Sequence, residues 1–104
     1  MYDDSLIDKL QKKAFKSFLS INLDRDLLLN KQINFNNVFV GVILNKVTEK
    51  NVYEVYIYIK TNTKIACPLK YSLIEDEKEA KTEYFKNKKF IETTNFDNIV
   101  KAFI

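Results

Sequence analysis

Three runs of β-branched and aromatic residues in the middle of the chain constrain the fold most. They cover residues 38–47, 52–60 and 64–73, and residues of these types favour strands. The connecting segments, 48–51 and 61–63, have the length of hairpin turns. The sequence therefore predicts a three-stranded antiparallel meander, in which neighbouring strands follow one another along the chain (order 1-2-3).

The pairing of these runs can be predicted from side-chain alternation. Pairing Val47 with Val52 across the first turn places Val42 opposite Ile57, and pairing Lys60 with Lys64 places Ile57 opposite Cys67. A slip of one residue would send a strand's side chains to the other face of the sheet, so a consistent aliphatic face supports this register. That predicted face consists of Val40, Val42, Leu44, Val55, Ile57, Ile59, Ile65, Cys67 and Leu69.

The opposite face is expected to be mixed and to carry Tyr56 and Tyr58. Tyr58 would lie between two small residues, Gly41 and Ala66, so that its ring covers bare backbone. Pro68 cannot donate to a ladder, which predicts that the third strand lies at an edge. The first run is uncharged from Val38 to Leu44. If nothing covers it, this edge is open to pairing with a second copy of the chain.

Helices are expected on both sides of the meander. Amphipathic spacing predicts a first helix over residues 5–20. A short second helix is expected after Asp24, carrying Leu27, Leu28 and Leu29, followed by a loop rich in asparagine.

Acidic residues from Glu75 to Glu79 predict the start of a third helix. Its inner face would hold Ala80, Tyr84 and Phe85, and lysines 86, 88 and 89 would close it. Residues 90–93 are open to two interpretations, a short strand or a link. Thr94 with Asp97 then predicts a cap for a last helix that runs to the end of the chain. With 104 residues, one glycine and one proline, the whole chain (1–104) is expected to form a single α+β domain flanked by N-terminal and C-terminal helices.

The composition disfavours an enzyme. The chain has no histidine, which removes the commonest general base and zinc ligand. Cys67 is the single cysteine and Gly41 the single glycine, so neither a CxxC motif nor a glycine-rich phosphate loop can form. The acidic residues 75–79 have the placement of helix-starting acids rather than of metal ligands. We therefore expect no catalytic residues, no metal and no cofactor.

The mixed face of the sheet is the candidate binding surface. Residues 36–74 hold five lysines and two glutamates, a net charge of +3. Tyrosine is frequent in protein interfaces, and lysines around it would form a charged rim. The residues expected to contact a partner are Tyr56, Tyr58, Lys60, Lys64, Glu54 and Lys50. Tyrosine with lysine is also typical of platforms that stack single-stranded nucleic acid, although a single arginine weakens that alternative.

No family motif is found. In profile, as a small, glycine-poor chain without histidine, the protein is similar in kind to phage and mobile-element inhibitors such as anti-CRISPR proteins, and to toxin-immunity proteins. That resemblance implies an inhibitor or adaptor that occupies a surface of a larger effector, such as a nuclease or its ribonucleoprotein. The alternative is binding of RNA or single-stranded DNA, and a third is a homodimer through the edge from Val38 to Leu44.

The acidic start of the chain, the single cysteine and the short apolar runs predict a cytoplasmic protein without a membrane segment.

Overall fold

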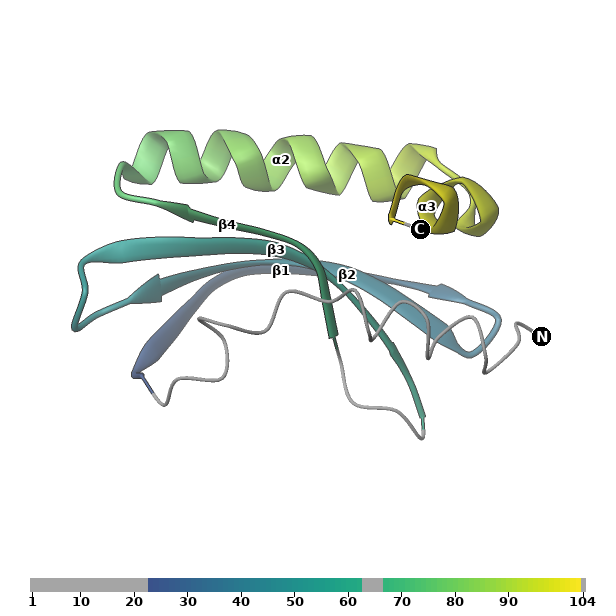
Figure 1. Ribbon diagram of the computed structural model, residues 1–104, viewed down its shortest axis with the longest axis horizontal. Coiled ribbons are helices and arrows are strands. Elements are labelled where there is room, and N and C mark those ends of the chain that lie inside the picture. The colour runs from purple at the N-terminus through teal and green to yellow at the C-terminus, as the bar shows by residue number, and fades with distance from the viewer. Residues whose placement is uncertain (1–22, 63–66, 104) are drawn as a thin grey trace.

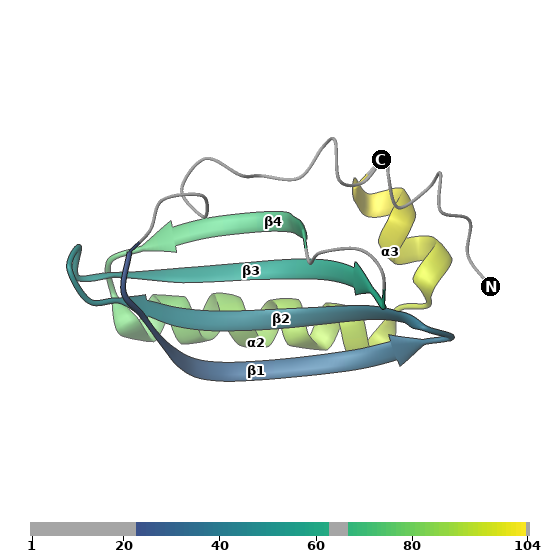
Figure 2. The same ribbon diagram turned by 90° about the horizontal axis from the view of Figure 1, so that it is seen from below.

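A computed structural model describes residues 23–62 and 67–103. The fold is α+β, with a four-stranded antiparallel sheet in the order β1-β2-β3-β4 and two helices (Figures 1 and 2). The elements are β1 (Arg25–Phe35), β2 (Val38–Val47), β3 (Val52–Thr61), β4 (Cys67–Ile74), α2 (Glu77–Thr93) and α3 (Phe96–Phe103). The α+β class and the meander are confirmed, but the sheet has one strand more than predicted. The helix expected over 5–20 lies outside the described residues.

The additional strand is β1, in the segment where a short helix and a loop were expected. A two-residue turn, Asn36 and Asn37, joins it to β2, and both residues have positive φ (53° and 74°). This is the backbone that tight β-hairpins require, and asparagine tolerates it well. The Asn34 side chain accepts a hydrogen bond from the Asn37 backbone N–H at 2.9 Å. The register shifts between Leu27 and Leu29. The three leucines that were predicted to be helical therefore lie in a strand that contains a β-bulge.

Pairing with β1 covers the edge of β2. Every residue from Val38 to Leu44 has a partner in β1 on one side and in β3 on the other. The edge from Val38 to Leu44 is therefore covered, so the condition under which pairing with a second copy was expected is not met in this structure.

The predicted register is right for one hairpin and wrong for the other. Between β2 and β3, Val47 pairs with Val52 and Val42 with Ile57, as expected. Between β3 and β4, Cys67 lies opposite Ile59 rather than Ile57, because the connection is longer than the predicted turn. A further shift between Ile57 and Tyr58 places Lys70 opposite Ile57. Ile65 and Ala66 lie outside the described residues.

The aliphatic face of the sheet is covered by α2 (Figure 1). The Asp76 side chain caps this helix by accepting a hydrogen bond from the Glu79 backbone N–H at 3.0 Å. Ala80, Tyr84 and Ile91 are buried against the sheet. Phe85, expected on the inner face, is 52% exposed, since it lies beyond the stripe defined by those three residues.

Two helices, separated by Thr94 and Asn95, form the last described part of the chain. Residues 90–93 continue α2 instead of forming a strand or a link. The last helix, α3, forms where expected, but its cap is Asn95, whose side chain accepts a hydrogen bond from the Asn98 backbone N–H at 2.9 Å. Phe96, Ile99 and Val100 of α3 join the core. We call the sheet face under α2 the helix side and the opposite face the far side.

Candidate functional site

The far side of the sheet holds a charged group in a fully buried position. Glu54, in β3, is 0% exposed. Its Oε1 accepts hydrogen bonds from the Arg25 Nε at 2.6 Å and from the Asn45 Nδ2 at 3.4 Å. Its Oε2 accepts one from the Tyr71 hydroxyl at 2.6 Å. A buried carboxylate needs such partners because it has lost its hydration.

Strand pairing explains how these four residues meet. Asn45 and Glu54 are register partners in β2 and β3, and Tyr71 of β4 lies opposite Tyr56, two residues further along β3. Arg25, at the start of β1, is on the same face as Asn45. Each of the four strands thus contributes one member of this cluster, which we call the Glu54 network (Arg25, Asn45, Glu54 and Tyr71).

The titration of these groups reflects their contacts. The hydrogen bond to Glu54 raises the pKa of Arg25, although partial burial opposes this. Burial, followed by the hydrogen bond to Glu54, raises the pKa of Tyr71 well above its ordinary value. The guanidinium and the phenol therefore keep their protons at neutral pH, so both act as donors to the carboxylate.

Three tyrosines form a row that begins with Tyr71 of this network and continues with Tyr56 and Tyr58. The rings of Tyr56 and Tyr71 are stacked, with centroids 6.0 Å apart, and those of Tyr56 and Tyr58 meet edge to face at 6.5 Å. The Tyr58 hydroxyl donates to the Gln32 Oε1 at 2.7 Å, which ties β3 to β1 across β2. The Tyr58 ring lies directly over Gly41, where a Cβ would overlap it. The expected covering of Gly41 by Tyr58 is confirmed.

The structure brings some of the predicted site residues together and separates others. Glu54, Tyr56, Tyr58 and Lys60 lie on the far side, as alternation predicted. However, Tyr58 is 5% exposed and Glu54 is fully buried, so neither offers side-chain surface in this conformation.

Two predicted lysines are also placed, one of them apart from the tyrosines. Lys60 is half-buried, and its Nζ lies 5.7 Å from the centroid of the Phe39 ring. Lys50 is exposed in the turn between β2 and β3, away from the tyrosines. Lys64 lies outside the described residues.

Four far-side residues were missed from the sequence. Arg25 and Leu27 were assigned to a helix, and Tyr71 and Leu73 were assigned to a wrong register. Leu27 is 61% exposed and Leu73 is 46% exposed. The pair Asn36–Asn37 was a usable signal, since two such residues between apolar runs favour a hairpin and would have placed Arg25 and Leu27 on a strand.

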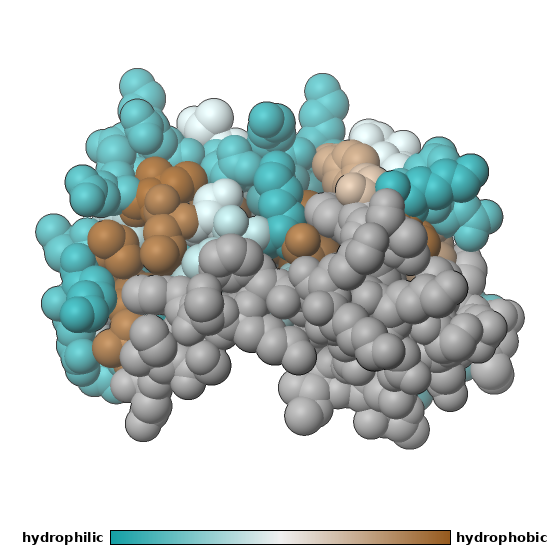
Figure 3. Space-filling model, in the orientation of Figure 1, coloured by the Kyte–Doolittle hydropathy of each residue, from teal (hydrophilic) through white to brown (hydrophobic). Residues whose placement is uncertain are grey.

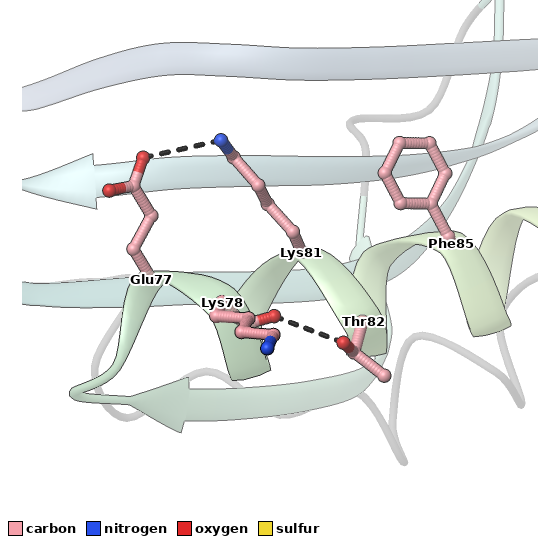
Figure 4. Close-up of a pocket in the computed structure, with 5 residues that line it drawn as sticks. All are labelled: Glu77, Lys78, Lys81, Thr82 and Phe85. Atoms are coloured by element: carbon pink, nitrogen blue, oxygen red, sulfur yellow. Dashed lines mark hydrogen bonds and ion pairs between the residues drawn. The ribbon is translucent and has the colours of Figure 1, made fainter.

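A second surface feature lies on the outer face of α2. Figure 4 shows a shallow groove there, lined by Glu77, Lys78, Lys81, Thr82 and Phe85. Its polar groups pair within the helix: Lys81 Nζ lies 3.4 Å from Glu77 Oε1, and the Thr82 hydroxyl donates to the Lys78 carbonyl at 3.0 Å. Figure 3 shows mainly hydrophilic residues over this helix. Such i, i+4 contacts are ordinary on a solvated helix face.

Comparison with known proteins adds no relative. No protein family, curated protein or solved structure matches this chain. Within residues 23–62 and 67–103, no three His, Cys, Asp or Glu side chains are grouped as a metal ion would require. Neither α2 nor α3 combines the length and apolar character needed to cross a bilayer.

Proposed function

We propose that this chain is a non-enzymatic protein-binding domain that acts as an inhibitor or adaptor by occupying a surface of a larger effector. The observation that carries the proposal is a row of four paired residues across the far side: Leu27, Asn45, Glu54 and Leu73. The two leucines at its ends are 61% and 46% exposed, and the two polar residues between them are buried.

The spacing of this row fits a protein interface. Leu27 and Leu73 are three strand intervals apart, about 14 Å at ~4.8 Å per interval. Tyr56 and Tyr71 stand beside the row. Apolar anchors with tyrosine beside them and charged residues at the rim are typical of surfaces that bury against another protein. We call Leu27, Leu73, Tyr56 and Tyr71 the contact residues.

The Glu54 network prepares this surface for binding. Its hydrogen bonds hold Arg25 and Tyr71 against β3 before any partner arrives. Side chains that are already ordered lose little conformational freedom on association, so more of the interaction energy appears as affinity. Tyr58 and Glu54 thus support the surface from within, while Tyr56 and Lys60 lie at it.

The charge of the chain favours an acidic partner surface. The full sequence has a formal net charge of +3, and complementary charge speeds association and selects partners. A nuclease or its ribonucleoprotein, in the cytoplasm, remains the effector class we propose. Lys50 and Lys64 are proposed as rim contacts.

Binding of single-stranded RNA or DNA is the second candidate, favoured by the stacked rings of Tyr56 and Tyr71. The electrostatics of the far side weigh against it. Arg25 is paired with Glu54, and Lys60 lies over Phe39. Binding of a phosphate backbone needs lysine or arginine side chains that neutralise phosphates and so release the counterions condensed on the nucleic acid. Protein binding is therefore the better supported function.

The test compares two interface variants with a matched control. Leu27→Asp and Leu73→Asp each place a charge in the contact surface, and Phe85→Asp makes the same change on the outer face of α2. The tagged wild-type chain is used to isolate a partner from its own cells, and affinities are then measured with the two purified proteins. Loss of either apolar anchor is expected to weaken binding by at least about thirtyfold, while Phe85→Asp leaves the affinity unchanged.

Three results would count against the proposal. Equal affinity of all three variants would place the interface elsewhere. Failure of the two far-side variants to fold, judged by circular dichroism, would show that the leucines are structural. Steep, salt-dependent binding of single-stranded oligonucleotides by the wild type would favour the second candidate.

A further inference from the structure

The ring of Tyr58 is buried on a face of the sheet that carries no described helix. It extends from β3 across β2, since it lies over Gly41 and its hydroxyl donates to Gln32 of β1. One face of the ring therefore rests on the backbone of β2. Tyr56 meets the ring at 6.5 Å and Pro68 is its partner in β4, so these two lie at its edges. The outer face of the ring points away from the sheet, yet only 5% of Tyr58 is exposed.

The two described helices cannot cover that outer face. Both α2 and α3 pack on the helix side, where the apolar core lies (Figure 1). The part of the far side around Tyr58 is also apolar, because Phe39 and Ile43 flank Gly41 on the same face of β2 and are half-buried. An apolar sheet face is stable when another element packs against it. The burial of Tyr58 therefore indicates a second layer over this part of the far side.

Only one part of the chain outside the described residues is long enough to form that layer. Residues 63–66 and 104 are too few, which leaves residues 1–22. An apolar stripe at helical spacing runs through residues 5–20 and consists of Leu6, Ile7, Leu10, Ala14 and Phe18. Three lysines fall on the opposite side of the same predicted helix, namely Lys9, Lys12 and Lys16. Such a helix offers one apolar face to a sheet and one charged face to solvent.

The segment also has the reach that the position of Tyr58 requires. It joins the sheet at Arg25, and Gln32, which bonds to Tyr58, lies seven residues further along β1, about 23 Å at ~3.3 Å per residue. A helix over residues 5–20 would be about 24 Å long at ~1.5 Å per residue. The four residues 21–24 add up to about 14 Å when extended. A helix in this segment can therefore lie over Tyr58 while it remains connected to β1.

We propose that residues 5–20 form a helix whose apolar stripe packs on the far side of the sheet, over Tyr58, Phe39 and Ile43. The sheet is then the middle of three layers. Leu27 and Leu73 lie in the row of Glu54, four residues from Tyr58 along β3 and about 13 Å away. They are 61% and 46% exposed, so the contact residues at that end stay accessible beside the docked segment. The inference goes beyond the proposed function, and it holds whether or not a partner binds there.

The test measures nuclear Overhauser effects in the 13C-labelled full-length chain. The methyl groups of Leu6, Ile7 and Leu10 should show them to the ring protons of Tyr58, because the effect arises only between protons in close contact. A mixture of labelled and unlabelled chains separates contacts within one chain from contacts between two. Effects within one chain support the proposal. Effects only between chains would show that a second copy covers the ring, and their complete absence would show that the stripe does not touch it; either result would overturn the proposal.

Three variants assign the contact to the apolar stripe, with the effects from the Ile7 methyl groups as the readout. Leu10→Gln places a polar group within the stripe, and the effects should be lost. Lys12→Gln introduces the same side chain on the opposite side of the predicted helix and should leave them unchanged. Leu10→Met keeps the volume and apolar character and should retain them. Unchanged effects in Leu10→Gln would contradict the proposed packing. If that variant does not fold, the measurement on the wild type still decides the outcome.

Discussion

Glu54 is the residue whose surroundings most determine the character of the far side. Its carboxylate is fully buried and is held by Arg25, Asn45 and Tyr71. A buried ion pair contributes little net stability when compared with a well-packed apolar pair, but removing one member leaves the other with a large desolvation penalty. Each member of the Glu54 network should therefore tolerate substitution poorly.

The first prediction concerns Glu54→Gln. The amide keeps the shape of the carboxylate but not its charge, so the partly buried guanidinium of Arg25 loses the charge of the carboxylate that it contacts at 2.6 Å. We expect the free energy of unfolding to fall by about 2–4 kcal/mol, measured by urea denaturation. Glu49→Gln, in the exposed turn, is the control and should change it by less than about 0.5 kcal/mol. Similar values for both variants would contradict this account of the network.

The second prediction concerns the contact between Gly41 and Tyr58. A Cβ at position 41 would overlap the Tyr58 ring, so Gly41→Ala must displace the ring and disturb its hydrogen bond to Gln32. We expect a loss of about 1–3 kcal/mol, as for other overpacked sites. In a Tyr58→Ala background the same change should have little effect, which a double-mutant cycle measures. Additive effects would show that the ring is not the cause.

The third prediction concerns alkaline pH. Burial and the bond to Glu54 raise the pKa of Tyr71 above the ordinary value of 10.0. Above that pH the unfolded chain releases the proton and the folded chain keeps it, so the free energy of unfolding falls as pH rises. Tyr71→Phe should make this decline shallower, as measured by urea denaturation at a series of alkaline pH values. It should not abolish the decline, because the pKa values of Tyr56 and Tyr58 are raised as well. An unchanged slope would contradict the prediction.

Part of the candidate site could be predicted from individual residues. Alternation along one strand places Glu54 and Tyr56 on the same face whatever the neighbouring strands do. Arg25 and Tyr71 could not be found in this way, because their positions depend on pairings between different strands. The exposure of Tyr58 was also unpredictable, since its burial depends on its hydrogen bond to β1 and on Pro68 beside it.

At the scale of the element, local signals predicted the helices after residue 76 better than the outer strands. The start of α2 follows from Asp76 and the acidic residues near it, and the start of α3 follows from its apolar spacing. For β1, three consecutive leucines fit a helix as well as a strand, and only pairing with β2 decides between them. For β4, a longer connection and a bulge set the register, and neither has a marker in the sequence.

The fourth prediction concerns the cap of α2. Asp76→Ala removes the acceptor of the Glu79 N–H hydrogen bond, so we expect the free energy of unfolding to fall by about 1 kcal/mol. Asp76→Asn keeps the acceptor and should recover most of this loss. Thermal unfolding followed by circular dichroism distinguishes the three proteins. Equal stability of the alanine and asparagine variants would show that charge at the helix start, rather than the cap, is what matters.

At the scale of the whole molecule, the described part consists of one sheet layer and one helix layer (Figure 1). The strands β2 and β3 have neighbours on both sides, while β1 and β4 each have one partner among the described strands. The apolar core lies between α2, α3 and the two inner strands. The inner strands should therefore open only when the whole domain unfolds.

The fifth prediction follows from this arrangement. Backbone amides of β2 and β3 should exchange with solvent at least about tenfold more slowly than those of β1, because opening an outer strand breaks fewer contacts. Amide hydrogen exchange measured by NMR gives the rates for each residue. Equal protection across all four strands would show that β1 opens only together with the inner strands.

Lys70 and Tyr71 are adjacent in β4, yet they serve opposite layers. The lysine ammonium reaches Asn87 of α2, and the tyrosine hydroxyl reaches Glu54 on the other face. Two successive side chains thus hold this strand to α2 on the helix side and to Glu54 on the far side. Sliding β4 by a single position would turn both side chains to the opposite faces and break the two hydrogen bonds together, so the register of this outer strand is secured from both faces of the sheet.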